Sequence, residues 1–252
     1  MRFAQGRPEM NIIICENLMD ADRMLEKLIK KELTGEEGER FDRSVGLVEA
    51  SIGRMVPIQT EEMRQGDPLR VCVEGYGFLP VDRDAFKGSI PEMSGLVPYS
   101  PFEYYLRRKL WLHNMGHACC AYMGMYAGKT YIYEAAAETD ILLLTRAAML
   151  ESVAALAETY KVSVRDLINH MDDLLYRFTN RALGDTCARV GGDIRRKMAP
   201  EDRLIGAARL CIKTGIPPVH IALGAAAAVR QFLIEEGTAQ DSAAAMDALK
   251  AL

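Results

Sequence analysis

Hydrophobic residues recur along the chain in two patterns that predict different structures. Short β-branched or apolar runs predict strands at Asn11–Cys15, Val45–Ala50 and Val71–Glu74. Apolar residues spaced three and four apart after Asp20 predict a helix, and Gly35 is suited to its C-terminal stop. We therefore expect mixed α/β structure in roughly the first hundred residues.

The pattern changes after Pro98 and becomes helical. Ser100, Pro101 and Glu103 predict a helix start, with the serine as cap and the glutamate closing a capping box, and this helix should run to about Tyr126. Further helical patterns cover about Asp140–Tyr160, Ser163–Phe178, Glu201–Thr214, Pro217–Glu235 and Asp241–Leu252.

These patterns predict an α+β chain that is mainly α. We expect a partial α/β segment over residues 1–97, followed by an α-helical domain over residues 98–252. Apolar residues make up 49% of the chain and charged residues 26%, which provides enough material for a hydrophobic core and excludes a disordered chain.

Charge and cysteine content exclude several classes of protein. The net charge of −4 argues against a nucleic-acid partner. The apolar run Ile221–Val229 is far shorter than the roughly 20 residues of a membrane span, and the N-terminus lacks the features of a signal peptide. Six cysteines without a C-x-x-C motif fit a reducing compartment, so we expect a cytoplasmic protein with no membrane partner.

The densest polar chemistry lies on the long helix, at Lys109, Asn114 and His117. At about 100° per residue, these side chains project at roughly 0°, 140° and 80°, so they can face a common cleft. A desolvated lysine can act as a general base, an amide can stabilise a developing oxyanion, and an imidazole can bind a hydroxyl. The alternative is a solvated lysine beside histidines that pack in the core.

A metal site is a further alternative. His113 and His117 lie four residues apart and share a helix face, as zinc ligands do. No glutamate follows the first histidine, so the H-E-x-x-H signature is absent, and no third ligand is evident. We therefore expect no metal.

Several stretches resemble, in order, the mannitol dehydrogenase family of polyol-specific long-chain dehydrogenases. The strongest is Arg108–Ala118, which contains the K-x4-N-x2-H pattern of that family. The others are Asn11–Leu18, Val45–Pro57, Phe86–Gly88, Ala121–Gly124, Arg177–Asn180, Arg189–Gly191 and Asp202–Ile205. The resemblance spans nearly the whole chain and is greatest to members that oxidise mannitol 1-phosphate.

The resemblance implies a fold and a set of roles. It implies a helical substrate domain like the C-terminal domain of 6-phosphogluconate dehydrogenase, after the remnant of a Rossmann domain. Lys109 would be the general base, Asn114 and Asn17 would flank the reacting oxygen, and His117 would contact a neighbouring hydroxyl. NAD would take the hydride, with Asn17 also on the cofactor side, and the substrate would be a polyol phosphate or sugar phosphate.

A phosphorylated substrate needs cations near its far end. Arg189, Arg195, Arg196 and Lys197 form a basic stretch, and Arg189 and Lys197 match positions of the family. The alternative is a solvated loop.

The chain departs from the family in two ways. The glycine-rich turn that binds NAD is absent from it, so we expect the end of the dinucleotide domain plus the substrate domain. Gly53, Arg181, His113 and the segment Gly75–Pro80 replace residues that are usual in the family. These departures leave two functions open: the substrate part of a dehydrogenase whose nucleotide half lies in another segment or chain, or a non-catalytic sugar-phosphate-binding or interaction module. The possible protein partners are a separate nucleotide-binding chain or a second copy of this chain.

Overall fold

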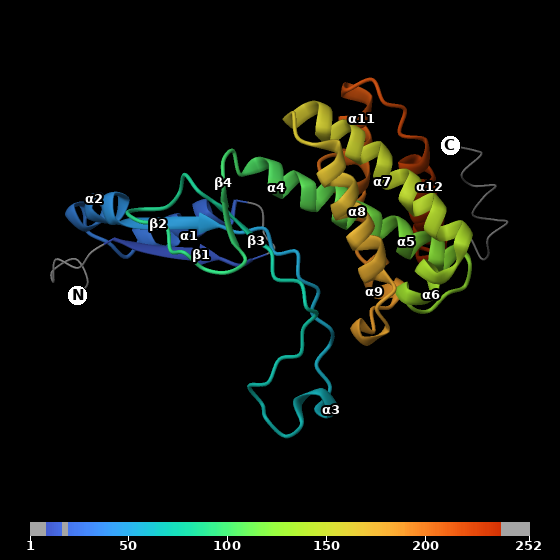
Figure 1. Ribbon diagram of the computed structural model, residues 1–252, viewed down its shortest axis with the longest axis horizontal. Coiled ribbons are helices and arrows are strands. Elements are labelled where there is room, and N and C mark those ends of the chain that lie inside the picture. Colours follow the sequence, from blue (N-terminus) through green and yellow to red (C-terminus); the bar gives the residue numbers. More distant parts are fainter. Residues whose placement is uncertain (1–8, 17–19, 238–252) are drawn as a thin grey trace. The chain divides into compact units, whose positions relative to one another are not determined.

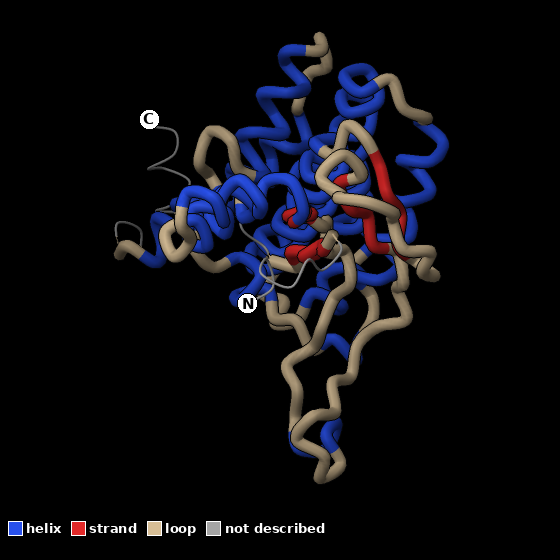
Figure 2. Tube along the Cα trace, turned by 90° about the vertical axis from the view of Figure 1, so that its left-hand side faces the viewer, coloured by secondary structure: helices blue, strands red, loops and turns tan. Residues whose placement is uncertain are grey.

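The structure is a computed structural model that describes residues 9–16 and 20–237 (Figure 1). The chain forms two compact units, Met1–Met55 with Val73–Leu106, and Val56–Cys72 with Arg107–Leu252. The strands belong to the first unit, and most helices belong to the second (Figure 2). The expectation of a mainly helical α+β chain with a partial Rossmann segment is confirmed.

The first unit contains two small parallel sheets. Its elements are β1 (Met10–Ile14), α1 (Ala21–Lys30), α2 (Gly35–Ser44), β2 (Val45–Glu49), β3 (Leu79–Asp82) and β4 (Leu96–Tyr99). In the first sheet Ile12 lies opposite Leu47, and in the second Val81 lies opposite Pro98. Val48, Val81 and Ala50 form the centre of the core. The first two predicted strands are therefore confirmed within one residue at each end.

An asparagine side chain holds the loop beside the first sheet. The Asn11 amide accepts a hydrogen bond from Lys87 N (2.8 Å) and donates one to Lys87 O (3.0 Å). A Cβ atom on Gly46 would lie 2.2 Å from Asn11 Oδ1 and 2.5 Å from Ala85 O. Glycine is therefore required at position 46 for the loop to approach the strand.

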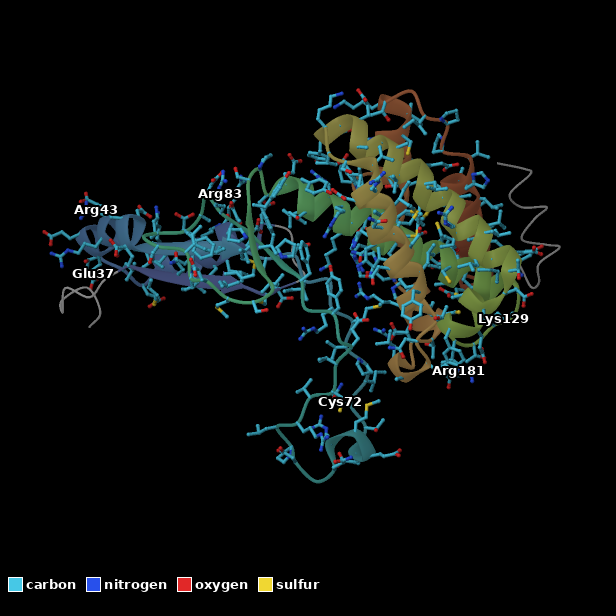
Figure 3. All side chains as sticks on the ribbon, viewed as in Figure 1. Glu37, Arg43, Cys72, Arg83, Lys129 and Arg181 are labelled. Atoms are coloured by element: carbon cyan, nitrogen blue, oxygen red, sulfur yellow. The ribbon has the colours of Figure 1, made fainter. Side chains whose placement is uncertain are left out.

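The third predicted strand, Val71–Glu74, is wrong. The backbone N–H and C=O of Cys72 pair with the side-chain amide of Gln59, at 2.7 and 2.9 Å (Figure 3 labels Cys72). One side chain thus takes the place of a neighbouring strand, and neither sheet of residues 9–16 and 20–237 includes this segment. The short helix α3 (Glu61–Arg64) lies between the two partners in the sequence.

Two predicted helix boundaries in the first hundred residues also differ. Gly35 does not stop a helix but begins α2, after a capping box formed by Thr34 and Glu37. Ser100 does not cap a helix, because its hydroxyl donates to the carboxylate of Asp84 and α4 (Glu103–Arg108) begins three residues later.

The second unit is helical. Its remaining elements are η2 (Lys109–Asn114), α5 (Met115–Tyr126), α6 (Ile132–Ala137), α7 (Thr139–Tyr160), α8 (Val164–Phe178), η3 (Arg181–Leu183), α9 (Cys187–Gly191), α10 (Ile194–Lys197), α11 (Arg203–Lys213) and α12 (Val219–Glu235). The four long helices predicted between 140 and 235 are confirmed within about two residues, and the helix predicted at 241–252 lies outside the described residues. Among the helices that the structure describes, none has the length and apolar character to cross a membrane.

Helix α5 is the centre of this unit and contacts α6, α7, α9, α11 and α12. Small residues allow the close packing: a Cβ on Gly116 would lie 2.5 Å from Met149 Sδ, and one on Gly224 would lie 2.3 Å from Cys119 Sγ. Cys119 and Cys120 are buried in α5 as small apolar residues, and burial raises the pKa of both thiols.

A carboxylate of α7 caps α12. Glu151 accepts hydrogen bonds from the backbone N–H groups of His220 (2.8 Å) and Ile221 (3.0 Å), and it also contacts His220 Nδ1 (2.7 Å). The N-cap residue of α12, Pro218, makes no side-chain cap of its own. Glu151 therefore satisfies donors that the helix leaves open and places negative charge at the positive end of its dipole.

Two histidines of this unit, the buried His113 and the half-buried His170, lie in surroundings that favour their neutral form. Burial, and then the charges of Arg108 and Arg177, lowers the pKa of His170 to about 3. Burial, followed by His117 and Arg177, lowers the pKa of His113 well below its ordinary value. Both folded-state pKa values lie below the value of an unfolded histidine. The two histidines therefore leave the free energy of unfolding undiminished above about pH 6.5, and that free energy falls as the pH drops below this value.

Replacing the capping carboxylate should weaken the fold. Glu151→Ala leaves two helix N–H groups without their acceptor, so we expect a loss of about 1–3 kcal/mol of unfolding free energy, measured by urea denaturation. The control is Glu158→Ala on the same helix, an exposed residue paired with Lys161, which should change stability by less than about 0.5 kcal/mol. Equal effects of the two variants would contradict the capping role.

Removing the half-buried His170 should make the free energy of unfolding less dependent on pH. Between pH 7 and 5, a histidine that stays neutral in the folded chain lowers the free energy of unfolding by about 2 kcal/mol, because only the unfolded chain takes up a proton. We expect His170→Gln to reduce the loss of unfolding free energy between pH 7 and pH 5 by about that amount, measured by urea denaturation at each pH. An identical loss in both proteins would show that His170 titrates normally in the folded state.

Candidate functional site

The predicted motif lies where one long helix changes its winding. The α-helix α4 ends at Arg108, a π-helical turn, η2, runs from Lys109 to Asn114, and α-helical winding resumes in α5 at Met115. The sequence predicts an uninterrupted α-helix here, so the π turn is a correction. Such turns are rare, and they are frequent at functional sites.

The π turn brings the motif residues together. Because a π turn winds more widely than an α-helix and its hydrogen bonds join residues five apart, Lys109 and Asn114 stand at the two ends of one turn, with a smaller angle between them than the roughly 140° of an α-helix. His117 follows three residues later in α5, so it neighbours Asn114 on the same face. All three side chains are half-buried. The lysine, the amide and the imidazole thus share one side of the helix.

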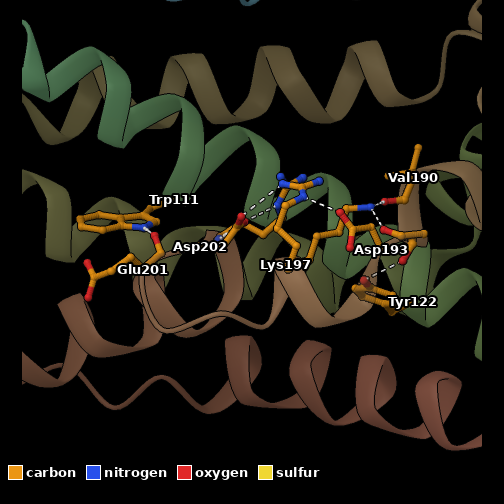
Figure 4. Close-up of polar contacts among 11 residues, drawn as sticks. Trp111, Tyr122, Val190, Asp193, Lys197, Glu201 and Asp202 are labelled. Carbon is orange, nitrogen blue, oxygen red and sulfur yellow. Dashed lines mark hydrogen bonds and ion pairs between the residues drawn. The ribbon is translucent and has the colours of Figure 1, made fainter. Parts of the chain in front are cut away.

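Two contacts from other helices hold the π turn. Ser152 Oγ, buried in α7, donates to Trp111 O at 2.6 Å and so satisfies a carbonyl of the turn. The indole of Trp111 donates to Glu201 O at 3.4 Å, and a Cβ on Gly206 would lie 2.5 Å from Trp111 Nε1 (Figure 4). The turn is therefore pinned to α7 on one side and to the start of α11 on another.

The environment favours the neutral forms of both titratable residues. Burial, and then the charge of Arg203, lowers the pKa of Lys109. Burial, followed by Arg189 and Arg203, lowers the pKa of His117 to about 3, and its ring stacks on Phe178 with centroids 4.7 Å apart. A lysine that releases its proton more easily can act as a general base, and a neutral imidazole can both donate and accept a hydrogen bond.

Arg189 reaches this face through a carboxylate that sequence reasoning missed. The guanidinium of Arg189, with 51% of its side chain exposed, bonds to Asp185, which is buried. The other carboxylate oxygen of Asp185 lies 3.9 Å from His117 Nε2. Asp185 thus connects the predicted phosphate residue to the predicted substrate histidine.

Lys197 lies in a helix rather than in a solvated loop. Its residue is only 6% exposed, and its ammonium donates to Val190 O at 2.8 Å and to Gly192 O (Figure 4). Burial, followed by Arg203, lowers the pKa of Lys197 to about 8. Tyr122 OH donates to Gly191 O at 2.8 Å and fixes the same bend of the chain.

Arg203 is the second residue that sequence reasoning missed. It begins α11, and its charge acts on Lys109, His117 and Lys197, so it lies within electrostatic range of all three. The motif Asp202–Ile205 marked the region but gave the arginine no role, because only the folded chain brings it near Lys109.

Two further predictions concern Asn17 and a metal site at His113 and His117. Asn17 lies outside the described residues. Within residues 9–16 and 20–237, no three His, Cys, Asp or Glu side chains are grouped so that they could hold a metal ion. His113, the other member of the candidate metal pair, is buried beside Phe178, with ring centroids 6.2 Å apart.

The first unit has a cavity of about 310 Å³, and the predicted site residues that the structure describes are not among those that line it. Its walls include Arg54, Tyr76, Phe78 and Met93, and Gly53 packs against the Tyr76 ring. Gly53 is one of the departures from the family pattern, and a Cβ atom there would lie 3.1 Å from Tyr76 Cε1.

Both halves of the chain match domains of known proteins. Residues 102–249 match the Mannitol dehydrogenase C-terminal domain, and residues 1–95 match the Mannitol dehydrogenase Rossmann domain. A mannitol-1-phosphate 5-dehydrogenase of Bacillus licheniformis is 32% identical over 229 residues, which cover 91% of this chain and 59% of that protein. The chain thus spans little more than half the length of that relative.

Two solved structures share the fold. The Pseudomonas fluorescens mannitol 2-dehydrogenase ternary complex with NAD and D-mannitol has a TM-score of 0.67 at 24% identity, and a substrate-free D-sorbitol dehydrogenase has a TM-score of 0.77 at 18% identity. Each comparison covers 92% of this chain and 49% of the other chain. With two domain matches that together span nearly all of its length, the chain belongs to the mannitol dehydrogenase family.

Proposed function

We propose that this chain provides the substrate-binding and catalytic part of an NAD-dependent polyol dehydrogenase. The proposed substrate is a polyol phosphate, and the reaction converts mannitol 1-phosphate to fructose 6-phosphate. The observation that carries this proposal is the shared face of Lys109, Asn114 and His117, on which burial lowers the pKa of the lysine. The name of the Bacillus licheniformis relative supports the choice of substrate.

Each side chain has one task in the proposed reaction. Lys109 Nζ takes the proton from the hydroxyl that is oxidised, and its lowered pKa increases the fraction of neutral amine near physiological pH. The Asn114 amide donates to the same oxygen as negative charge develops on it. His117, neutral because its pKa is about 3, binds a neighbouring hydroxyl. No metal has a task in this scheme.

The first unit fits part of an NAD-binding domain. Its strands β1 and β2 are parallel, and helices lie between them in the chain, as in dinucleotide-binding sheets. Asn17 follows the carboxyl end of β1 by three residues, and ligands of such sheets bind beyond the carboxyl ends of the strands. We therefore assign Asn17 to the cofactor and the reacting oxygen. NAD, when bound, supplies the hydride acceptor.

Arg189 and Lys197 are the proposed cations for the phosphate end. Arg189 supports this role through its half-exposed guanidinium, which pairs with Asp185, and the carboxylate of Asp185 also lies 3.9 Å from His117 Nε2. Lys197 supports it through its charge and through the bend of the chain that its ammonium stabilises. We also propose that the functional boundary lies near residue 97, with the cofactor part before it and the substrate part after it.

The role of Lys109 can be tested in a reconstituted enzyme. The chain is co-expressed with the glycine-rich nucleotide-binding segment of a relative, and NADH formation from mannitol 1-phosphate is followed. We expect Lys109→Ala to lower kcat by about 10²-fold or more, because the general base is lost. Lys161→Ala, an exposed lysine in an ion pair with Glu158, is the matched control and should leave kcat unchanged.

Two results would contradict this function. A Lys109→Ala enzyme with wild-type kcat would show that Lys109 is not the general base. Stabilisation of the chain by mannitol 1-phosphate, together with no NADH formation in any reconstituted mixture, would favour the alternative of a non-catalytic sugar-phosphate-binding module.

A further inference from the structure

The side chain of Arg203 is largely buried, and only the Nε of its guanidinium is bonded to another described residue. Its side chain is 13% exposed, and its Nε donates to Asp202 Oδ1 at 2.8 Å. Among the described residues, neither terminal nitrogen of Arg203 has a hydrogen-bond partner. An arginine presents its donors in a rigid planar fork, so fixing Nε also fixes the direction of the other two nitrogens.

Asp202, which binds Nε of Arg203, makes further contacts that fix its position. Asp202 Oδ1 accepts the backbone N–H of Arg203 at 2.6 Å, and Asp202 Oδ2 lies 3.3 Å from Arg196 Nη1. The preceding residue, Glu201, receives the indole of Trp111 from the π turn (Figure 4). The start of α11, and Arg203 with it, is thereby fixed against the segment that carries Lys109.

The other cations of this region are more fully occupied or more exposed. Lys197 gives two of its three donors to backbone carbonyls. Arg189 is half-exposed and bound to Asp185. Arg196 is 55% exposed and shared between Asp193 and Asp202. Arg203 therefore combines low exposure, a fixed orientation and donors without a protein partner.

The charges around this fork favour an anion. Among the described residues of this cluster, Arg189, Arg196 and Arg203 pair with the carboxylates of Asp185, Asp193 and Asp202, and Lys197 adds a fourth positive charge that is bound to carbonyls. Lys109 adds a further positive charge when it is protonated. An arginine fork matches the geometry of phosphate, and bidentate contacts of this kind are among the stronger hydrogen bonds in proteins.

We propose that the two terminal nitrogens of Arg203 bind the phosphate group of the substrate, with Arg189 and Lys197 beside it. This inference rests on the proposed function, because it assigns a ligand within the same site. The influence of Arg203 on the pKa values of Lys109 and His117 supports it, since it places the guanidinium within electrostatic range of the reacting end of the substrate.

The test is binding of mannitol 1-phosphate and of mannitol to the full chain, measured by calorimetry. We expect wild type to bind the phosphate ester more tightly than mannitol. Arg203→Gln should weaken binding of the ester by about 10- to 100-fold while changing the affinity for mannitol by less than about threefold. Arg203→Lys, which keeps the charge but not the fork, should fall between. Arg209→Gln, an exposed arginine on the same helix, should match wild type.

The outcomes separate this inference from the proposed function. If Arg203→Gln and Arg203→Lys both bind the ester as wild type does, while Arg189→Gln does not, Arg203 is not the phosphate ligand but the polyol-phosphate function stands. If affinity for mannitol falls as much as affinity for the ester, the arginine is only structural. If wild type binds neither compound, both proposals fail. Should Arg203→Gln not fold, as judged by circular dichroism, the comparison with Arg203→Lys decides.

Discussion

The hydrogen bond from Ser152 to the carbonyl of Trp111 is the contact on which the arrangement of the site depends. A π turn is less favourable than α-helix and persists where its surroundings satisfy the backbone groups that it displaces. Ser152 does this from α7, and the indole of Trp111 fixes the same turn to α11. Without the turn, Asn114 would project about 140° away from Lys109. The wide turn thus narrows the angle between two side chains that the sequence spacing alone already directs toward a common cleft.

The electrostatics of the site follow from where these helices place their charges. Burial keeps the imidazoles of His113 and His117 neutral, while the cations near them lower both pKa values further. Two buried or nearly buried carboxylates, Asp185 and Asp202, offset part of the positive charge and fix the directions of their arginines. A site of this kind disfavours further cations, including a protonated lysine, and favours anionic ligands.

Much of the fold could be predicted from the sequence, because local signals determined it. The long helices α7 and α8 follow apolar spacing, and Ser163 caps α8 by accepting from Asp166 N as a local pattern predicts. Helix α2 was missed because its sequence, GEEGERFDRS, has little apolar character, and its capping box replaces the usual hydrophobic signal. Val71–Glu74 has the alternation of a strand, but none of the strands in the described part of the chain pairs with it.

The site could be predicted only in part. The spacing of Lys109, Asn114 and His117 identified one helix face, and the family resemblance assigned the roles. The π turn could not be foreseen, because a serine some forty residues later in the chain stabilises it. Asp185 and Arg203 belong to other helices, and no local pattern relates them to Lys109. Contacts that depend on the packing of distant helices are the part that sequence patterns do not contain.

The fold lowers the pKa of Lys109 below that of a solvated lysine and so prepares the amine to act as a base. The most direct test of this lowered pKa is an NMR titration of the lysine side chains labelled with ¹³C at Cε, with the Lys109 signal assigned by its loss in Lys109→Ala. We expect Lys109 to titrate below the ordinary lysine value of 10.5. A Lys109 signal that titrates at or above that value would contradict the account.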